Sequence, residues 1–464
     1  MTPEPTFAPA PEVVERALAA SRGDGCVVIV RESSNVNARF AVNTATSNGR
    51  SRSREVTVVS LVNGARGVAT ASAQRSGEVD VVDLVAASEA LARSAPPAPD
   101  AAALVTGGAD ADFAVEAPAT TRDELVAVVG GLTRAFPDAE RRGVTLAGFA
   151  THTVTTTYLG SSAGPRRRFV QRTGEFQLNG RADGGRRSSW SSAAGPTLTA
   201  LDVDAHVGDV HKRLEWARAT RDVGAGRYET VLPPVAVADL MIYLYWTMSA
   251  RDARDGRTVF SAPGGTTRVG ERLSDLGFTL SSDPAAPGME CEPFVAVSAS
   301  SNVASAFDNA APLGPVKWID AGVLARLFTP RADAERERTE FAAPIDNLAL
   351  ELPGSSGTTE DLVSRTERGL LVTSLWYMRE VDPASLLLTG LTRDGVYLIE
   401  DGAVVGAVNN FRFNESPVDV LARSLETGAT ERTVGREFGQ YFNRVAMPAL
   451  RVAEFNMSSV SPAS

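Results

Sequence analysis

The stretch YETVLPPVAVADLMIYLYWTMSARD, residues 228–252, joins a strand to an apolar helix and decides much of the fold. Val231 and Leu232 are typical of a strand. Proline tolerates the first turn of a helix, so Pro233 and Pro234 predict that a helix begins directly after this strand. The residues that follow are apolar and compatible with a helix, which we expect to cover Val235–Arg251.

The bulk composition is that of an ordinary globular protein, with 43% hydrophobic and 22% charged residues among 464. A chain of this length suggests about three domains. The formal net charge is −10, so long-range attraction to nucleic acid or to an anionic membrane is not expected. No apolar run approaches the ~20 residues of a membrane helix, and the N-terminus does not resemble a signal peptide. These features predict a cytoplasmic protein with neither a nucleic-acid nor a membrane partner.

The pattern of helices and strands predicts an α+β fold, with N-terminal α/β domains followed by a strand-rich C-terminal domain. The expected domains are residues 1–99, 100–223 and 224–464, and the proline-rich residues 94–99 predict a linker between the first two. In the first domain, Asn48 and Gly49 predict a turn. In the second, a helix is expected from Thr121 to Phe136, because Thr121 and Glu124 fit a capping box.

Few residues offer nucleophilic or metal chemistry. The chain has three histidines, His152, His206 and His211. On a regular helix, His206 and His211 would lie ~140° apart, which favours a pair of surface residues over a metal site. His152 lies in a Thr-rich strand, where the polar face of a sheet is the favoured interpretation. The two cysteines, Cys26 and Cys291, are far apart and outside any C-x-x-C pattern, so we expect reduced thiols.

Three further patterns have ordinary structural interpretations. Residues 160–164 match the letters of the G-x-S-x-G elbow, with Ser162 in the nucleophile position, but no helix follows and a hairpin turn is favoured. The arginines at 166–168 and 186–187 favour a solvated strand face paired with carboxylates over a contact with an acidic peptide or nucleic acid. The aromatic residues Tyr245, Trp246, Trp376 and Tyr377 are expected in the core.

Short segments along nearly the whole chain resemble, in order, those of the TldD/PmbA family. Besides the strand–Pro–helix unit, they are residues 43–58, 67–72, 319–327, 369–376, 395–406 and 447–452. The third resembles the "I-x-x-G-V-L" hairpin of the family, and the last its closing "P-x-L-R-V" strand. Each segment is short, but the ordered set is much more specific than any one of them.

The resemblance implies one of two paralogous subunits. In this family TldD carries a His-Glu-x-x-x-His zinc motif and a C-terminal cysteine, whereas TldE, also called PmbA, lacks them and pairs with TldD in a cytoplasmic metalloprotease. The positions of this chain that match the motif read Tyr243, Leu244 and Met248, and the cysteine position falls near Val434. None of these is a plausible zinc ligand. The resemblance is therefore to TldE, without a catalytic residue, metal or cofactor of its own, and with zinc expected in the partner subunit.

We therefore expect a TldE-like, non-metal subunit of a TldD–TldE zinc metalloprotease complex that processes or degrades peptides. By itself the chain is expected to be catalytically inactive, because a hydrolytic zinc needs three protein ligands and a polarised water. The alternative is a stand-alone, non-enzymatic peptide-binding protein or homodimer. An independent hydrolase with an unrecognised site is a third hypothesis. The acidic charge gives little support to the family's older description as a gyrase modulator.

Overall fold

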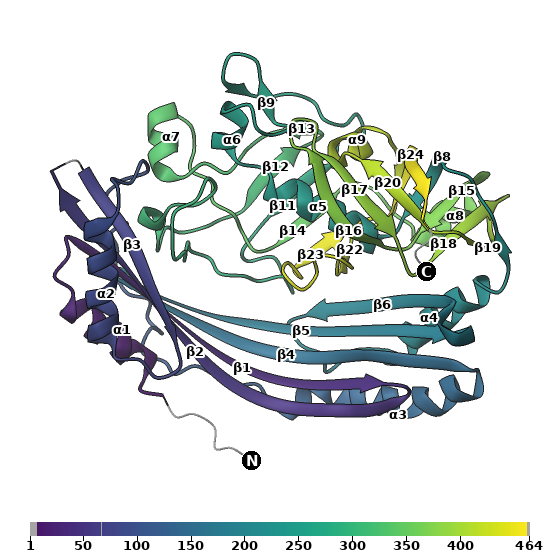
Figure 1. Ribbon diagram of the computed structural model, residues 1–464, viewed down its shortest axis with the longest axis horizontal. Helices are drawn as coiled ribbons and strands as arrows, with labels where there is room; N and C mark the ends of the chain where they lie inside the picture. The colour runs from purple at the N-terminus through teal and green to yellow at the C-terminus, as the bar shows by residue number, and fades with distance from the viewer. Residues whose placement is uncertain (1–6, 66, 462–464) are drawn as a thin grey trace.

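The computed structural model describes residues 7–65 and 67–461, which form two layers (Figure 1). The lower layer is a long, curved sheet with helices on its outer face. The upper layer is the C-terminal region, which lies against the other face of that sheet. The predicted α+β fold, with a strand-rich C-terminal part, is confirmed.

The lower sheet is antiparallel and has the strand order β3-β2-β1-β4-β5-β6. Its strands are β1 (Gly25–Ala41), β2 (Thr44–Gly64), β3 (Gly67–Ser76), β4 (Val144–Ser161), β5 (Arg166–Ala182) and β6 (Arg187–Gly195). Strands β1 and β4 pair continuously from Val27↔Ser161 to Phe40↔Gly148. Residues 1–99 and 100–223, which the sequence divides into two domains, therefore contribute to one common sheet.

The β1–β2 turn lies at Val42 and Asn43 rather than at Asn48 and Gly49, so the predicted turn is wrong. Both turn residues have positive φ, 52° and 55°, as a two-residue hairpin requires. The Asn43 side chain donates to the Val144 carbonyl (2.9 Å) and accepts from the Leu146 N–H (2.7 Å). These bonds to β4 stabilise a conformation that is costly for valine.

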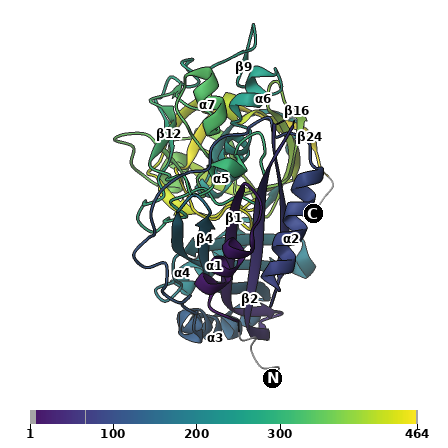
Figure 2. The same ribbon diagram turned by 90° about the vertical axis from the view of Figure 1, so that its left-hand side faces the viewer.

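Helices cover the outer face of the lower sheet, and Figure 2 shows α1 and α2 on that side. They are α1 (Ala10–Ala20), α2 (Val81–Ser94), α3 (Val126–Arg141) and α4 (Val203–Trp216), with short 3₁₀ turns at Arg122–Leu125 and Asp183–Gly185. Phe40, Phe176 and Leu178 of the sheet form a core with α3 and α4. The opposite face receives the C-terminal region, because Val27 and Ile29 pack against Phe307.

The predicted capping box at Thr121 is wrong, because the Thr121 side chain caps nothing. Residues 122–125 form the 3₁₀ turn, and α3 begins only at Val126. The Glu124 carboxylate instead accepts from the Thr197 hydroxyl (2.5 Å) and the Leu198 N–H (3.3 Å). Glu124 therefore contacts residues 197–198 instead of forming the predicted capping box with Thr121.

The upper layer contains two main sheets that surround helix α5 (Pro234–Trp246). The first has the order β13-β12-β11-β14-β23-β22, and the second β16-β17-β20-β24-β8-β15-β18-β19-β7, with β21 beside β24. The strands of the first are β11 (Thr279–Ser282), β12 (Val316–Asp320), β13 (Val323–Leu324), β14 (Leu348–Glu351), β22 (Glu431–Thr433) and β23 (Val445–Met447). Those of the second are β7 (Thr220–Arg221), β8 (Gly226–Leu232), β15 (Arg368–Val372), β16 (Leu375–Asp382), β17 (Leu387–Thr392), β18 (Val396–Glu400), β19 (Ala403–Val408), β20 (Phe411–Glu415), β21 (Ser424–Thr427) and β24 (Leu450–Val460).

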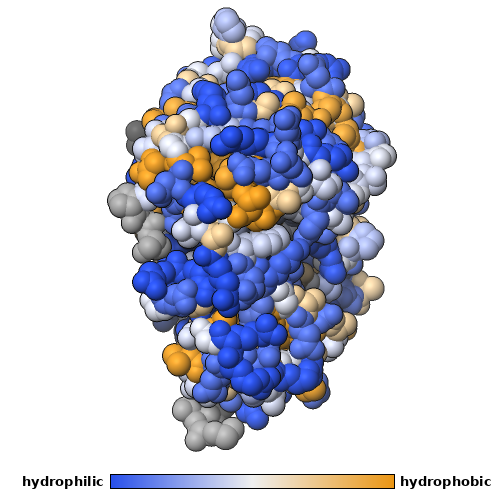
Figure 3. All heavy atoms as spheres, turned by 90° about the vertical axis from the view of Figure 1, so that its right-hand side faces the viewer, coloured by the Kyte–Doolittle hydropathy of each residue, from blue (hydrophilic) through white to orange (hydrophobic). Residues whose placement is uncertain are grey.

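The remaining elements of the upper layer are short. They are β9 (Ser261–Ala262), β10 (Thr266–Thr267), a 3₁₀ turn (Ala306–Asp308), α6 (Ala250–Arg254), α7 (Arg331–Glu337), α8 (Thr359–Ser364) and α9 (Pro417–Ala422). In the described ranges, no helix has the length and apolarity that a membrane crossing requires. The end of the molecule at the right of Figure 1 carries mainly hydrophilic side chains, with hydrophobic ones in a few separate groups (Figure 3).

Both cysteines are buried thiols, one in each layer, and neither forms a disulfide in the described chain. Cys26 lies on β1, and Cys291 lies in a loop of the upper layer. Burial raises the pKa of Cys26 to about 11 and that of Cys291 to about 12, because a thiolate loses its hydration there. The prediction of unpaired thiols is confirmed.

Candidate functional site

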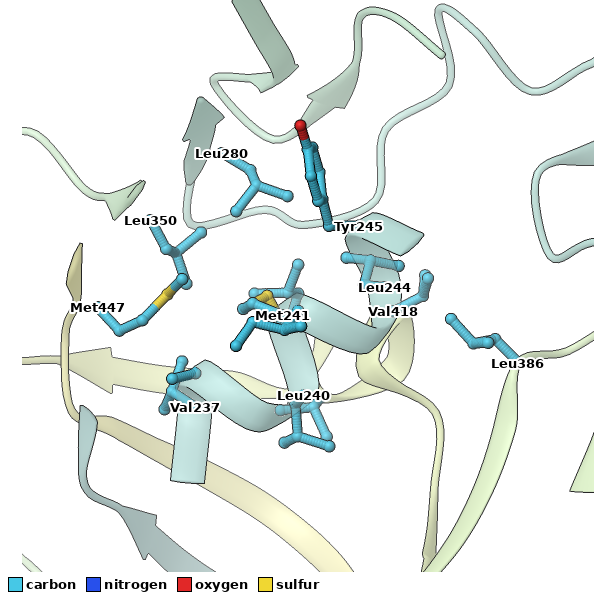
Figure 4. Close-up of a cluster of buried hydrophobic side chains, with 14 of the residues drawn as sticks. Val237, Leu240, Met241, Leu244, Tyr245, Leu280, Leu350, Leu386, Val418 and Met447 are labelled. Carbon is cyan, nitrogen blue, oxygen red and sulfur yellow. The ribbon is translucent and has the colours of Figure 1, made fainter. Parts of the chain in front are cut away.

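Helix α5 follows strand β8 directly, as the sequence predicts, and is buried on nearly every side. Ten of its thirteen residues are buried. Figure 4 shows Met241 facing Leu350 and Met447, whereas Leu244 lies beside Val418. A helix that is apolar all round belongs in a protein core, so most of α5 serves packing.

The helix is shorter than predicted, because it ends at Trp246 instead of Arg251. The Thr247 hydroxyl donates to the Leu244 carbonyl (2.8 Å), and α6 begins only after Ser249. Met248 therefore lies between two helices. Its carbonyl accepts from the Phe328 N–H (2.7 Å), which ties this break to a neighbouring loop.

The four positions that the sequence analysis assigns to the zinc and cysteine positions of the family lie in different surroundings. Leu244, Met248 and Val434 are fully buried, with side chains 0% exposed. Tyr243 is half-buried, and its ring lies 5.7 Å from that of Phe438 in the 434–444 loop. The structure thus brings Tyr243 and the loop of Val434 to the same end of α5. Two aliphatic groups, a thioether and a phenol do not fit zinc, which binds thiolate, imidazole and carboxylate.

Asp239, which the sequence analysis did not single out, attaches the 434–444 loop to α5. Its buried carboxyl accepts from the backbone N–H groups of Arg436 (2.9 Å), Glu437 (3.1 Å) and Phe438 (3.0 Å). A side chain at Gly435 would come within 2.3 Å of the same carboxyl, so the close approach requires glycine. Burial raises the pKa of Asp239 to about 7, although the three donors oppose that shift.

Arg436 connects the two layers. Its guanidinium lies 4.9 Å from the ring of Trp190 on β6 and 4.8 Å from that of Trp376 on β16. It also forms an ion pair with the buried Asp394 (3.3 Å). Cation–π contacts with two rings and a buried carboxylate hold this arginine in one position, so the 434–444 loop has a fixed place between the layers.

Exposed aromatic residues lie at the C-terminal end of α5, on the neighbouring strand β16 and in the 434–444 loop. The side chains of Trp246, Tyr377 and Tyr441 are 40%, 54% and 77% exposed. Among the described residues, the other large hydrophobic side chains that are exposed are aliphatic. Trp246 packs 5.0 Å from Phe438, and the Glu437 carboxylate accepts from the Tyr377 N–H (2.9 Å). We call Tyr243, Trp246, Tyr377 and Tyr441 the aromatic surface. The predicted core positions of Trp246 and Tyr377 are therefore wrong.

The backbone beneath the aromatic surface is irregular. Tyr377 has a φ of 53°, which is uncommon for a residue with a side chain. The register of β16 against β17 shifts between Trp376 and Arg379, so a bulge turns Tyr377 outward. The Arg379 guanidinium lies 4.4 Å from the Tyr377 ring. Exposed Trp, Tyr and Arg side chains are enriched in protein–protein interfaces.

A cavity of about 300 Å³ opens at the other end of α5, between the two layers. Its lining comes from β6, α4, the start of α5 and β22. Charged side chains of both signs reach it, and Trp190 and Trp216 supply aromatic surface. We call it the interlayer cavity.

The histidines form no metal site. The Nδ1 of His206 lies 2.8 Å from the Ser191 hydroxyl at the edge of the interlayer cavity, and His211 is 4.0 Å from an Asp138 carboxylate. His152 is fully buried and contacts the Thr120 hydroxyl (2.6 Å), so its predicted polar sheet face is wrong. In residues 7–65 and 67–461, no three His, Cys, Asp or Glu side chains group as a metal would require.

The other sequence patterns have structural roles. The Ser162 hydroxyl lies in the β4–β5 hairpin turn and accepts from the Cys26 N–H (3.0 Å), so this serine is not on a nucleophile elbow. Arg166, Arg167 and Arg168 form ion pairs with Glu15, Asp110 and Asp112 at 2.5, 3.0 and 2.7 Å. The hairpin turn at Ser162 is confirmed, and so is the pairing of Arg166, Arg167 and Arg168 with carboxylates, but the Arg168 side chain is only 8% exposed and is not solvated as predicted.

One sequence signal could have found Asp239, since a lone carboxyl inside an apolar helix is rarely buried without a partner. No comparable feature of the sequence points to Arg436. Its partners Trp190, Trp376 and Asp394 are distant in sequence, and only the tertiary structure brings them together.

Comparison with known proteins agrees with this architecture. The family model of the PmbA/TldA metallopeptidase C-terminal domain matches residues 225–459. No curated protein matches the chain. The solved structure of TldE from Thermococcus kodakarensis is 17% identical, with a TM-score of 0.76 over 96% of this chain and 98% of that one.

Two further solved structures share the fold. TM0727 from Thermotoga maritima, described as a proposed modulator of DNA gyrase, is 16% identical, with a TM-score of 0.73 over 96% of this chain and 99% of that one. BT3649 from Bacteroides thetaiotaomicron, described in the same way, is 14% identical, with a TM-score of 0.75 over 97% and 98%. The structural matches show the fold, and the family model shows the membership: the chain belongs to the PmbA/TldD family.

Proposed function

We propose that this chain is a TldE-like, non-metal subunit that pairs with a TldD-like zinc metallopeptidase in the cytoplasm and takes part in peptide processing. The observation that carries the proposal is the burial of apolar side chains at the positions where the resemblance places metal ligands. Where the resemblance places zinc ligands, Leu244 and Met248 are packed in the core, and Val434 is buried in the loop that Asp239 holds. A subunit without its own zinc chemistry can still contribute to a complex through its surface.

The aromatic surface supports a protein partner. It lies at the end of α5 beside the position of the lost motif, and Trp246 and Tyr377 have the chemistry of interface hot spots. In this proposal, the partner subunit supplies zinc and its ligands, and this chain supplies a rigid aromatic contact.

The test is reconstitution with the TldD-like subunit from the same genome. The two chains are expected to co-elute in size-exclusion chromatography, and this chain is expected to raise peptide cleavage by the partner. Trp246→Ser should weaken the complex, whereas Val129→Ser, a matched change of a 51% exposed residue on α3, should leave it unchanged. Cleavage that is complete with the partner alone and unaffected by this chain would refute the proposal.

A stand-alone peptide-binding protein or homodimer is the second candidate, and the interlayer cavity is the observation that favours it. This candidate predicts a stable chain that ignores the TldD-like subunit in chromatography yet binds peptide. The two candidates therefore differ in the co-elution experiment itself.

A further inference from the structure

The 434–444 loop contains a helical turn whose first amides are bound by Asp239. The Gly439 N–H donates to the Gly435 carbonyl (3.2 Å), which closes the turn. The first amides of a helical turn have no acceptor within it, and here they are those of residues 436–438. Consecutive N–H groups of this kind suit a negatively charged group. The Asp239 carboxyl, which is 0% exposed, supplies that group from α5.

Phe438, the last of these three residues, contacts most of the aromatic surface. Its ring lies 5.7 Å from that of Tyr243 and 5.0 Å from that of Trp246. Its carbonyl accepts from the Tyr441 N–H (2.9 Å). The position of the turn therefore determines where these three aromatic side chains lie.

Glu437 connects the same turn to the fourth member of the aromatic surface. Its carboxylate accepts from the Tyr377 N–H (2.9 Å) at the bulge of β16 and pairs with the Arg379 guanidinium (3.4 Å). That guanidinium in turn lies 4.4 Å from the Tyr377 ring. All four residues of the aromatic surface thus depend on a turn whose amides one buried carboxyl binds.

The contact between this turn and α5 leaves no room for a further atom. A side-chain carbon on Gly435 would lie 2.3 Å from the Asp239 Oδ1, closer than any real contact of that kind. The φ of Gly435 lies outside the left-handed region, so the backbone there would accept any residue. Glycine is therefore required for space alone, and a methyl group at this position would push the turn away from Asp239.

We infer that Asp239 is a positioning residue for partner binding, because its carboxyl holds the 436–438 amides and thereby fixes the aromatic surface that the partner subunit contacts. Its side chain is buried, so it acts only through the loop. A surface that is already ordered in the free chain loses less conformational entropy on association. The inference rests on the proposed function, since the TldD-like subunit is the partner concerned.

The first test follows association of the full-length chain with the immobilised TldD-like subunit by surface plasmon resonance. The pH is 8, above the pKa of about 7 at which the Asp239 carboxyl ionises. Asp239→Asn keeps the size of the side chain but offers one acceptor oxygen in place of two. We expect the association rate constant to fall about tenfold, because only about one chain in ten then has the loop in place. The dissociation rate constant should stay within about threefold of the wild type, whereas Trp246→Ser, which removes a contact of the surface itself, should raise it.

The second test displaces the turn from its own side. Gly435→Ala should also slow association about tenfold, because the added methyl group meets the Asp239 carboxyl. The double variant with Asp239→Asn should be slower than either single variant by no more than about threefold, since both changes disrupt one contact. Gly208→Ala on α4 is the matched control, because a methyl group there would meet no atom within 4 Å, and it should alter neither rate constant.

Hydrogen exchange of the free chain measures the contact without the partner. The 436–438 amides should exchange at least about tenfold faster in Asp239→Asn than in the wild type, because the loop then opens more often. The amides of α3 should exchange equally in both proteins. Thermal unfolding of each variant shows that it is folded.

Four outcomes would overturn the inference: wild-type association rates in both single variants, an effect on the dissociation rate alone, full additivity in the double variant, or equal exchange of the 436–438 amides. A wild-type chain that does not bind the partner would refute the proposed function, and this inference with it. Binding that Trp246→Ser weakens and Asp239→Asn leaves unchanged would refute the inference alone.

Discussion

The two ends of helix α5 have opposite chemistry. Its start at Pro234 borders the interlayer cavity, with charged groups from both layers, whereas its end at Trp246 exposes aromatic rings to solvent. Between these ends the helix is core, and Leu244 is fully buried. The one carboxyl inside the helix, Asp239, is occupied by three backbone N–H groups of the 434–444 loop, so the groups that remain open to a partner or ligand lie at the two ends of α5.

The largest effect is expected in the middle of the helix. Leu244→Ala should lower the free energy of unfolding by about 3 kcal/mol, because it removes buried methyl groups and leaves a cavity. Urea denaturation measures this loss. A change below about 1 kcal/mol would mean that the site collapses readily and that the contrast between the middle and the ends of α5 is weaker than described.

Asp239 should make stability depend on pH. The carboxyl has a folded pKa of about 7, above its ordinary 3.8, so the folded chain holds a proton that the unfolded chain has released. Its contribution is complete below pH 3.8 and is lost as the pH rises through 7. From pH 5 to pH 8 the free energy of unfolding should fall by about 2–3 kcal/mol more in the wild type than in Asp239→Asn. Parallel slopes for the two proteins would contradict this expectation.

Removal of Arg436 should loosen the connection between the layers. Arg436→Ala is expected to cost about 2 kcal/mol, because it deletes two cation–π contacts and leaves the buried Asp394 without its partner. Arg436→Lys, which keeps the charge but not the planar group, should recover only part of this. Full recovery by lysine would assign the whole effect to charge. Hydrogen exchange of the 434–444 loop is the second measurement.

The smallest effect on stability is expected at the aromatic surface. Trp246→Ser should change the free energy of unfolding by no more than about 1 kcal/mol, because the ring is 40% exposed and packs on one side only. Under the proposed function, the same change weakens partner binding about tenfold, as truncation of an interface tryptophan does. A large loss of stability with unchanged partner binding would place Trp246 with the core of the helix instead.

The sequence predicted the elements around α5 well, because Pro233 and Pro234 act locally on the helix start. Its end was missed, since the break at Met248 depends on a bond to Phe328, 80 residues away. The turn at Val42 was missed for a related reason, because contacts with β4 stabilise a conformation that the local residues disfavour. Local chemistry thus predicted the start of α5, whereas tertiary contacts decided its end, the β1–β2 turn and the start of α3.

The sequence predicted less of the candidate site than of the fold. The family resemblance is confirmed, whereas the assignment of Tyr243, Leu244, Met248 and Val434 to the zinc and cysteine positions stays a prediction. Exposure of Trp246 and Tyr377 could not be read from residue type, because aromatic residues serve cores and surfaces alike. Likewise, Asp239 and the Arg436 amide that it binds lie 197 residues apart in the sequence, and no local pattern relates them.

The two buried thiols allow local opening of each layer to be measured by chemical labelling. Cys26 lies in the lower layer and Cys291 in the upper one, and each has a pKa so high that little thiolate forms near neutral pH. A thiol reagent can therefore modify either residue only when its surroundings open. The two labelling rates would show, without any added probe, whether the layers unfold together or one before the other.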